Sequence, residues 1–211
     1  NWIPCSAYDN EQTEVRCRDL LTSAARANMN MIRVWGGGQY EKDVFYDLCD
    51  ELGLLVWHDQ MFSCAAYPDD RDFLDSVAAE CRHQFRRLRD HASIALWCGD
   101  NECIGALGWR EFTRGNPYHR RALEKRHEII AQAVAACDPS RVFWPSSPCA
   151  GPGDYADNWT NDKRGDMHNW QVWHEEKPFD EYRKYRPRFC SEFGYQSFPS
   201  REVAETFCAP E

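Results

Sequence analysis

The sequence lacks the features of nucleic-acid-binding and membrane-spanning proteins. Of its 211 residues, 25 are Lys or Arg and 34 are Asp or Glu, which gives a formal net charge of −9. Nucleic acid and anionic membrane surfaces repel such a chain at long range. There is also no apolar run long enough to cross a bilayer and no N-terminal stretch resembling a signal peptide. We therefore expect no nucleic-acid partner and no membrane partner.

Cysteine pairs and nucleotide-binding motifs are missing as well. The eleven cysteines are scattered singly with no C-x-x-C pair, which predicts reduced thiols that pack in the core. This favours a cytoplasmic location. Because the first residue is Asn1 and not Met, we expect the natural start to be missing, which leaves a lysosomal or secreted location open. No G-x-G-x-x-G and no P-loop follow an apolar run, and we predict no cofactor.

What the sequence does have is the composition of a globular protein rich in aromatic residues. Hydrophobic residues make up 43% and charged residues 28% of the chain, and there are nine tryptophans and eleven phenylalanines. Aromatic rings hold flat apolar ligands such as the faces of sugars, but they also fill cores. Composition alone leaves both roles open.

Short apolar runs alternate with longer stretches of helical period. The runs predicted to be strands are 31–35, 54–57, 93–98, 141–144 and 188–192, with 165–170 as a weaker candidate and 1–4 as the tail of a first strand. Apolar strands separated by amphipathic helices predict a parallel sheet covered by helices. Seven strands in series favour a (β/α)₈ TIM barrel, an α/β fold, over a doubly wound sheet. We expect residues 1–211 to be a barrel fragment with strands 1 to 7, truncated before the eighth βα unit.

Two glutamates follow apolar runs at predicted strand ends. Glu102 stands in "LWCGDNE" after the fourth strand, and Glu192 ends the seventh in "CSEFGYQSFPS". Catalytic groups of a barrel stand at the carboxyl ends of its strands, and strands four and seven lie roughly opposite each other. Two carboxylates that face each other suit cleavage of a glycosidic bond. The long loop 145–166 is expected at the same end and to carry part of a binding site.

Several of these stretches resemble a known family. "NMIRVWGGGQYEKDVFYDLCDELGLLVWHDQMFSCAAYP", "LWCGDNE" and "CSEFGYQSFPS" are similar to the catalytic barrel of the β-mannosidases of glycoside hydrolase family 2. "RVWGGG" discriminates best, because galactosidases and glucuronidases of that family carry a serine-histidine-tyrosine stretch there. The resemblance covers nearly the whole chain, and the β-sandwich domains that flank the family's barrel are absent from it.

The resemblance implies a retaining, exo-acting hydrolase that removes terminal β-D-mannose. It makes Glu102 the general acid/base and Glu192 the nucleophile, with Asn101 bound to the sugar 2-hydroxyl. Arg33 would approach the nucleophile and keep it ionised, although an ion pair in the barrel wall is an alternative. Trp35 would line the subsite for the terminal mannose, or else fill the core.

Further residues on the loops after strands four and six are candidate sugar contacts, namely Trp109, His168 and Trp170. We expect no metal, because neither His58 with Asp59 nor His168 with His174 has the spacing of a zinc site.

The expected partner is a β-mannoside oligosaccharide or glycan. Three alternatives stay open: an endo-β-mannosidase, an exo-β-glucosaminidase and a non-catalytic carbohydrate-binding barrel. Unpaired edges of an incomplete barrel favour a homo-oligomer and predict little activity from the fragment alone.

Overall fold

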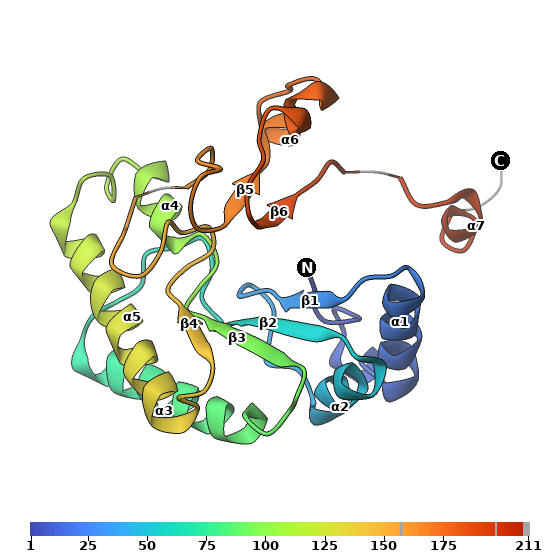
Figure 1. The fold of residues 1–211 in the computed structure, drawn as a ribbon, viewed down its shortest axis with the longest axis horizontal. Helices are drawn as coiled ribbons and strands as arrows, with labels where there is room; N and C mark the ends of the chain where they lie inside the picture. The colour runs from blue at the N-terminus through green and yellow to red at the C-terminus, as the bar shows by residue number, and fades with distance from the viewer. Residues whose placement is uncertain (157, 197, 209–211) are drawn as a thin grey trace.

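Two parallel sheets form the centre of the computed structural model, which describes residues 1–156, 158–196 and 198–208 (Figure 1). The first sheet has the strand order β1-β2-β3-β4, and the second pairs β5 with β6. The strands are β1 (Met31–Val34), β2 (Leu55–Asp59), β3 (Ile94–Cys98), β4 (Val142–Trp144), β5 (Met167–Asn169) and β6 (Cys190–Phe193).

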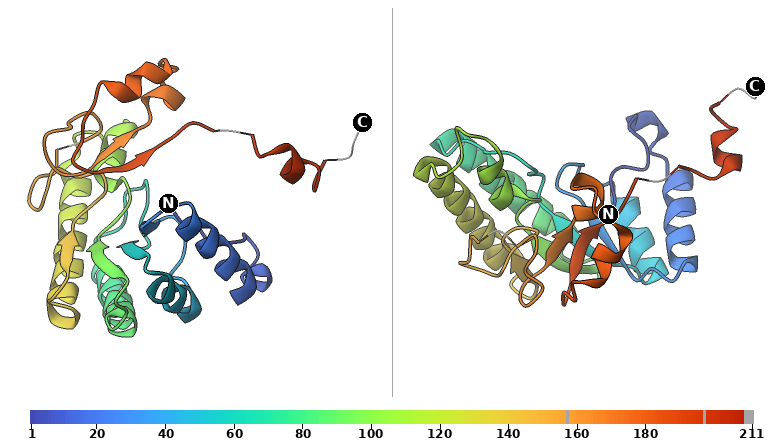
Figure 2. Two further views of the ribbon diagram at one scale, coloured as in Figure 1. Left: turned by 45° about the vertical axis from the view of Figure 1, so that its right-hand side comes forward. Right: turned by 90° about the horizontal axis from the view of Figure 1, so that it is seen from above.

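Four long helices stand in a row beside the first sheet, as Figure 2 shows. They are α1 (Glu14–Arg26), α2 (Asp43–Leu52), α3 (Arg71–Leu88) and α5 (Pro117–Cys137). The shorter elements are α4 (Cys103–Trp109), α6 (Gln171–His174), α7 (Arg201–Ala204) and the 3₁₀ turns η1 (Asp9–Glu11) and η2 (Phe179–Arg183). After β6 the chain runs away from the sheets to α7 (Figure 1). Within the described ranges, no helix is both long and apolar enough to cross a membrane.

The helix α3 shows how local sequence produces these elements. The Asp70 side chain accepts a hydrogen bond from the Phe73 backbone N–H at 3.0 Å and so caps the first turn. Val77, Cys81 and Phe85 then recur at steps of four and are buried. Such a stripe has to pack against another element to leave water, and α3 packs on α5. The helical period expected between the apolar runs is confirmed here.

The strand order of the first sheet is that of a barrel segment, because β1, β2 and β3 each pair in parallel with the next strand in sequence. A doubly wound sheet would reverse its order at one point. The prediction of seven strands in one ring is wrong for the described residues, however. Residues near Trp2 form only an isolated bridge with Val34, and no ladder joins β4 to β5. The loop 145–166 separates β4 from β5, so a closed barrel is not present in this part of the chain.

The turn that follows β3 is anchored by a buried ion cluster. Asp100 Oδ2 accepts hydrogen bonds from Arg126 Nη2 and His127 Nε2, each at 2.7 Å, and both partners lie on α5. The Arg126 guanidinium lies over the rings of Phe62 and Tyr67, 4.7 and 4.6 Å from their centroids. Burial opposes the charge of Asp100, but His127 and Arg126 outweigh it and lower its pKa to about 2. The two residues after Asp100 are Asn101 and Glu102, so the cluster holds them against α5.

We expect Asp100→Asn to lower the free energy of unfolding by about 3 to 5 kcal/mol, because it leaves Arg126 buried without its charged partner. Asp75→Asn, which removes a solvent-exposed ion pair with Arg71, should cost less than about 1 kcal/mol. Urea unfolding of both variants measures the difference. Since folding lowers the pKa of Asp100, its contribution is present above about pH 4 and is lost as the pH falls toward 2. Equal losses in the two variants would contradict this account.

Candidate active site

A cavity of about 810 Å³ opens at the carboxyl ends of the strands. Seven of the eight predicted site residues line it: Trp35, Asn101, Glu102, Trp109, His168, Trp170 and Glu192. Arg33 lies behind this wall and is buried, with 6% of its surface exposed. The structure thus gathers at one place side chains that are far apart in the sequence.

Glu102 has a strained backbone. Its φ of 57° and ψ of 12° lie in the left-handed region, which costs a non-glycine residue about 1 to 3 kcal/mol. The Glu102 N–H donates to the Ser147 carbonyl at 2.7 Å, and bridges join Asn101 to Ser63 and to Ser147. These contacts extend the sheet beyond its strand ends and hold the strained residue in place. Strain of this kind clusters at functional sites.

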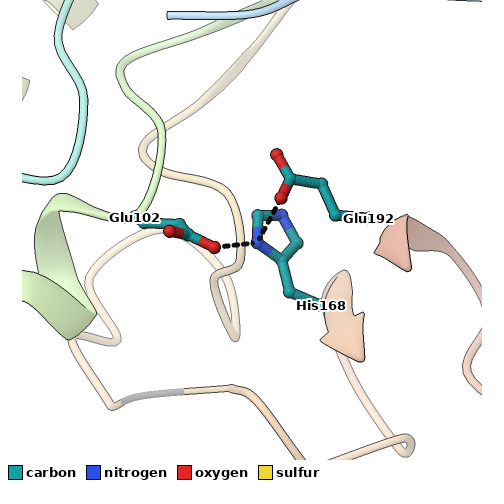
Figure 3. Close-up of side chains that lie close together, drawn as sticks. All are labelled: Glu102, His168 and Glu192. Carbon is teal, nitrogen blue, oxygen red and sulfur yellow. Dashed lines mark hydrogen bonds and ion pairs between the residues drawn. The ribbon is translucent and has the colours of Figure 1, made fainter. Parts of the chain in front are cut away.

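The two glutamates face each other across one imidazole (Figure 3). His168 Nδ1 lies 2.7 Å from Glu102 Oε1 and 3.4 Å from Glu192 Oε2. The facing oxygens of the two carboxylates are within 4.8 Å of each other. Retaining glycosidases have their carboxyl groups about 5 to 5.5 Å apart, whereas inverting enzymes need a wider gap for water. The spacing therefore suits direct attack by one carboxylate.

Arg33 on β1 organises the nucleophile side of the site. Its Nη1 lies 2.5 Å from Glu192 Oε1, and its Nη2 donates to Asn101 Oδ1 at 2.8 Å. Burial opposes the guanidinium charge, but coulombic attraction by Asp59 and Glu192 outweighs it and raises the pKa of Arg33. The guanidinium is therefore a permanent cation beside Glu192. The Trp170 indole N–H adds a second donor to Glu192, at 3.1 Å.

Asp59, which was considered from the sequence only as a metal ligand beside His58, belongs to this site through Arg33. It ends β2 and accepts from Arg33 through both oxygens, at 3.2 Å from Nε and 2.8 Å from Nη2. Such a two-point contact fixes the plane of the guanidinium. Asp59 also accepts from the Gly36 N–H and the Trp57 indole. An acid directly after a buried apolar run was the available signal, the same one that identifies Glu102.

Glycines set the position of Trp35. A Cβ at Gly37 would lie 2.1 Å from the Trp35 ring, and one at Gly36 would lie 2.5 Å from the Phe62 carbonyl oxygen. Neither contact is possible for a real side chain. The run "GGG" therefore lets the chain turn tightly after β1 and lets the indole fold over it beside the cavity.

A pair of tryptophans lines the other side of the cavity. Trp109 ends α4 with 46% of its surface exposed, and its ring centroid is 6.2 Å from that of Trp159. Trp159 packs against Gly105, where a Cβ would lie 2.9 Å away, and its ring meets His168 edge-on. Trp159, which the sequence analysis did not single out, comes from the loop 145–166. That loop supplies cavity walls as predicted.

Both ring nitrogens of His168 have protein partners, which differs from its predicted role as a sugar contact. Nδ1 faces Glu102, and Nε2 lies 3.0 Å from Ser147 Oγ. The side chain is almost fully buried on β5. Its two ring nitrogens thus contact Glu102 and Ser147, while the residue also lines the cavity.

One cluster of possible metal ligands is found in the described ranges. It consists of Glu102, His168 and Glu192. The guanidinium of Arg33 already supplies a positive charge to Glu192 at 2.5 Å. A metal ion there would meet repulsion from this buried cation. We assign no metal to the site.

Two facing carboxylates in a cavity at the ends of parallel strands, with an arginine on one of them, define the active-site arrangement of a glycoside hydrolase barrel. No protein-family model matches the chain. Curated relatives do: it is 41% identical to "Beta-mannosidase" of Bos taurus and 38% identical to "Beta-mannosidase B" of Aspergillus clavatus. Each match covers 100% of this chain, but only 25% and 26% of the relative.

A solved structure agrees with the sequence matches. The β-D-mannosidase of Dictyoglomus thermophilum is 42% identical, with a TM-score of 0.85 over 100% of this chain and 25% of that one. The chain is homologous to these β-mannosidases over its whole length. It spans about a quarter of the length of the relatives that it matches.

Proposed function

We propose that this chain carries the catalytic pair of a retaining exo-β-mannosidase. The observation that carries the proposal is the spacing of Glu102 and Glu192, whose facing oxygens are within 4.8 Å. The different partners of the two acids support different roles for them. Relatives named β-mannosidase suggest the sugar.

In the first step, Glu192 attacks C1 of a terminal β-mannose while Glu102 gives its proton to the departing glycosidic oxygen. The bond from C1 to that oxygen breaks, and an α-mannosyl ester forms on Glu192. In the second step, Glu102 takes a proton from water as the water oxygen attacks C1. The ester bond breaks and β-mannose leaves, so the configuration is retained after two inversions.

The two carboxylates differ in the charged and hydrogen-bonding groups that contact them. Arg33 and the Trp170 indole N–H both donate to Glu192, the carboxylate that attacks C1. Asn101 is fixed through its oxygen by Arg33, and its amide nitrogen donates to Ser63 Oγ at 3.3 Å and to Cys64 Sγ at 3.4 Å. We assign this amide N–H to the sugar 2-hydroxyl when substrate is bound. Such a bond strengthens as positive charge develops beside C2 in the transition state.

The aromatic walls suit a β-mannoside oligosaccharide or glycan. We place the terminal mannose against Trp35 and Trp170 on the Glu192 side. We place the next sugar against Trp109 and Trp159, beside the acid that protonates the bond between them. Aromatic faces bind sugar C–H groups in this way.

Turnover of a substrate panel tests the proposal with the protein at its natural length. We expect hydrolysis of an aryl β-mannoside at least tenfold faster than that of an aryl β-glucosaminide, and release of mannose one unit at a time from mannobiose and longer chains. Cleavage within the longer chains would indicate an endo-β-mannosidase. Faster glucosaminide turnover would indicate an exo-β-glucosaminidase, and mannose binding without turnover would indicate a carbohydrate-binding barrel.

Two further features of the protein belong to the proposal. All eleven cysteines are free in the structure, which supports a reducing, cytoplasmic location. The open edges of the two sheets support association into a homo-oligomer.

A further inference from the structure

Asp166 accepts four hydrogen bonds in a buried position behind the cavity. Oδ1 accepts from the Trp144 indole N–H at 2.8 Å and the Cys149 backbone N–H at 2.9 Å. Oδ2 accepts from the hydroxyls of Ser147 at 2.6 Å and Ser191 at 2.5 Å. These two distances are those of hydroxyls that donate to an ionised carboxylate. Both hydroxyl hydrogens are therefore committed to Asp166.

The oxygen of Ser147 can then only accept from its other neighbours. His168 Nε2 lies 3.0 Å away. A serine has one hydrogen, and that of Ser147 points to Asp166, so the hydrogen between Ser147 and His168 belongs to Nε2. Asp166 thus selects one tautomer of His168 through Ser147.

The other ring nitrogen of His168 faces the two glutamates. With the hydrogen on Nε2, Nδ1 carries a lone pair, and Glu102 Oε1 lies 2.7 Å from it. Two lone pairs at this distance repel each other unless a proton lies between them. A doubly protonated ring would supply one, but burial, together with the charge of Arg33, holds the pKa of His168 well below its ordinary value. The ring is neutral, and the proton has to come from the carboxyl group.

The surroundings decide which carboxyl group holds that proton. Glu192 lies farther from Nδ1, at 3.4 Å, and already accepts from Arg33 and Trp170. Near Glu102 Oε2 lies the Cys64 thiol at 3.3 Å, whose pKa burial raises to about 11, so it stays a neutral S–H group.

We propose that Asp166, Ser147 and His168 form a positioning relay that fixes the Nε2–H tautomer of His168 and thereby keeps the acidic proton on Glu102. This deepens the proposed function and rests on it for the use of the proton. Once Glu102 has donated to the leaving oxygen, its carboxylate faces the Nδ1 lone pair. That contact favours recovery of a proton from the attacking water in the second step.

The variant Ser147→Ala tests the relay, because it removes the acceptor of the Nε2 hydrogen. His168 is then free to donate from Nδ1 to an ionised Glu102. We expect kcat/KM for an alkyl β-mannoside to fall about tenfold, below the 10²- to 10⁴-fold loss of a whole general acid. The value for 2,4-dinitrophenyl β-mannoside should stay within about twofold, and the alkaline limb of the pH profile should move to lower pH. Ser191→Ala is the matched control, since the Ser191 hydroxyl contacts Asp166 and Ser147 but not His168. The variant keeps the bond from Ser147 to Asp166, so it should leave the dependence on leaving group unchanged.

Nitrogen NMR of the ¹⁵N-histidine-labelled protein gives a readout without turnover. We expect the His168 signals of the unmodified protein to show hydrogen on Nε2 and none on Nδ1, and the pattern to change in Ser147→Ala but not in Ser191→Ala. A hydrogen on Nδ1 in the unmodified protein would overturn the relay, as would equal losses on both mannosides. Absence of all β-mannoside turnover would instead overturn the proposed function, and the tautomer measurement would still decide the relay.

Discussion

Replacing Glu192 by alanine is expected to lower kcat/KM for every β-mannoside by on the order of 10⁵- to 10⁶-fold, because no covalent intermediate can form without the nucleophile. The loss in kcat/KM should be the same for substrates with good and with poor leaving groups. Azide should restore part of the turnover of an activated aryl mannoside by attacking from the vacated side, which gives the inverted product, α-mannosyl azide.

The matched control for this variant is Glu175→Ala. Glu175 lines the same cavity, but we give it no role in the reaction, so its loss should change kcat by less than about tenfold. A Glu192→Ala variant that kept appreciable activity without azide would assign the nucleophile to another residue. Release of β-mannosyl azide from it would do the same.

Replacing Glu102 by alanine should have a large effect of a different kind. Substrates with poor leaving groups need a proton on the departing oxygen and should lose about 10²- to 10⁴-fold in kcat/KM. The first step with 2,4-dinitrophenyl β-mannoside should be almost unaffected, because that group leaves without a proton. Azide should here yield β-mannosyl azide of retained configuration, since Glu192 still forms the ester. Equal losses on both substrates would count against Glu102 as the acid.

The two acids could be predicted from the sequence because their signal is local. Glu102 and Glu192 each follow a short apolar run, and a carboxylate at the end of a buried strand has to be paired or used. The strand pattern also predicts that the two acids lie at the same side of the fold, because parallel strands joined by helices have their carboxyl ends on one side. The structure does bring these two side chains together, with His168 between them.

What could not be predicted depends on contacts between distant segments. Nothing in the local sequence shows that Asp59 holds Arg33 at two points, or that Trp159 of a long loop packs against Gly105 and faces Trp109. The orientation of His168 depends in the same way on hydroxyls from two other segments. Strand counting predicted seven consecutive strands of a truncated barrel, but in the described residues β4 and β5 belong to separate sheets and do not pair.

The most direct test of the central claim is to trap the sugar on the protein. The probe is 2-deoxy-2-fluoro-β-D-mannosyl fluoride. Its fluorine at C2 slows both steps, and its fluoride leaving group speeds the first, so the ester on the protein should accumulate. Peptide mapping by mass spectrometry then locates the labelled residue. The account predicts one fluoromannosyl group on the tryptic peptide 189–201, attached to Glu192 and absent from the Glu192→Ala variant. Inactivation with the label on another residue, or hydrolysis of mannosides with inverted configuration and no adduct, would contradict it.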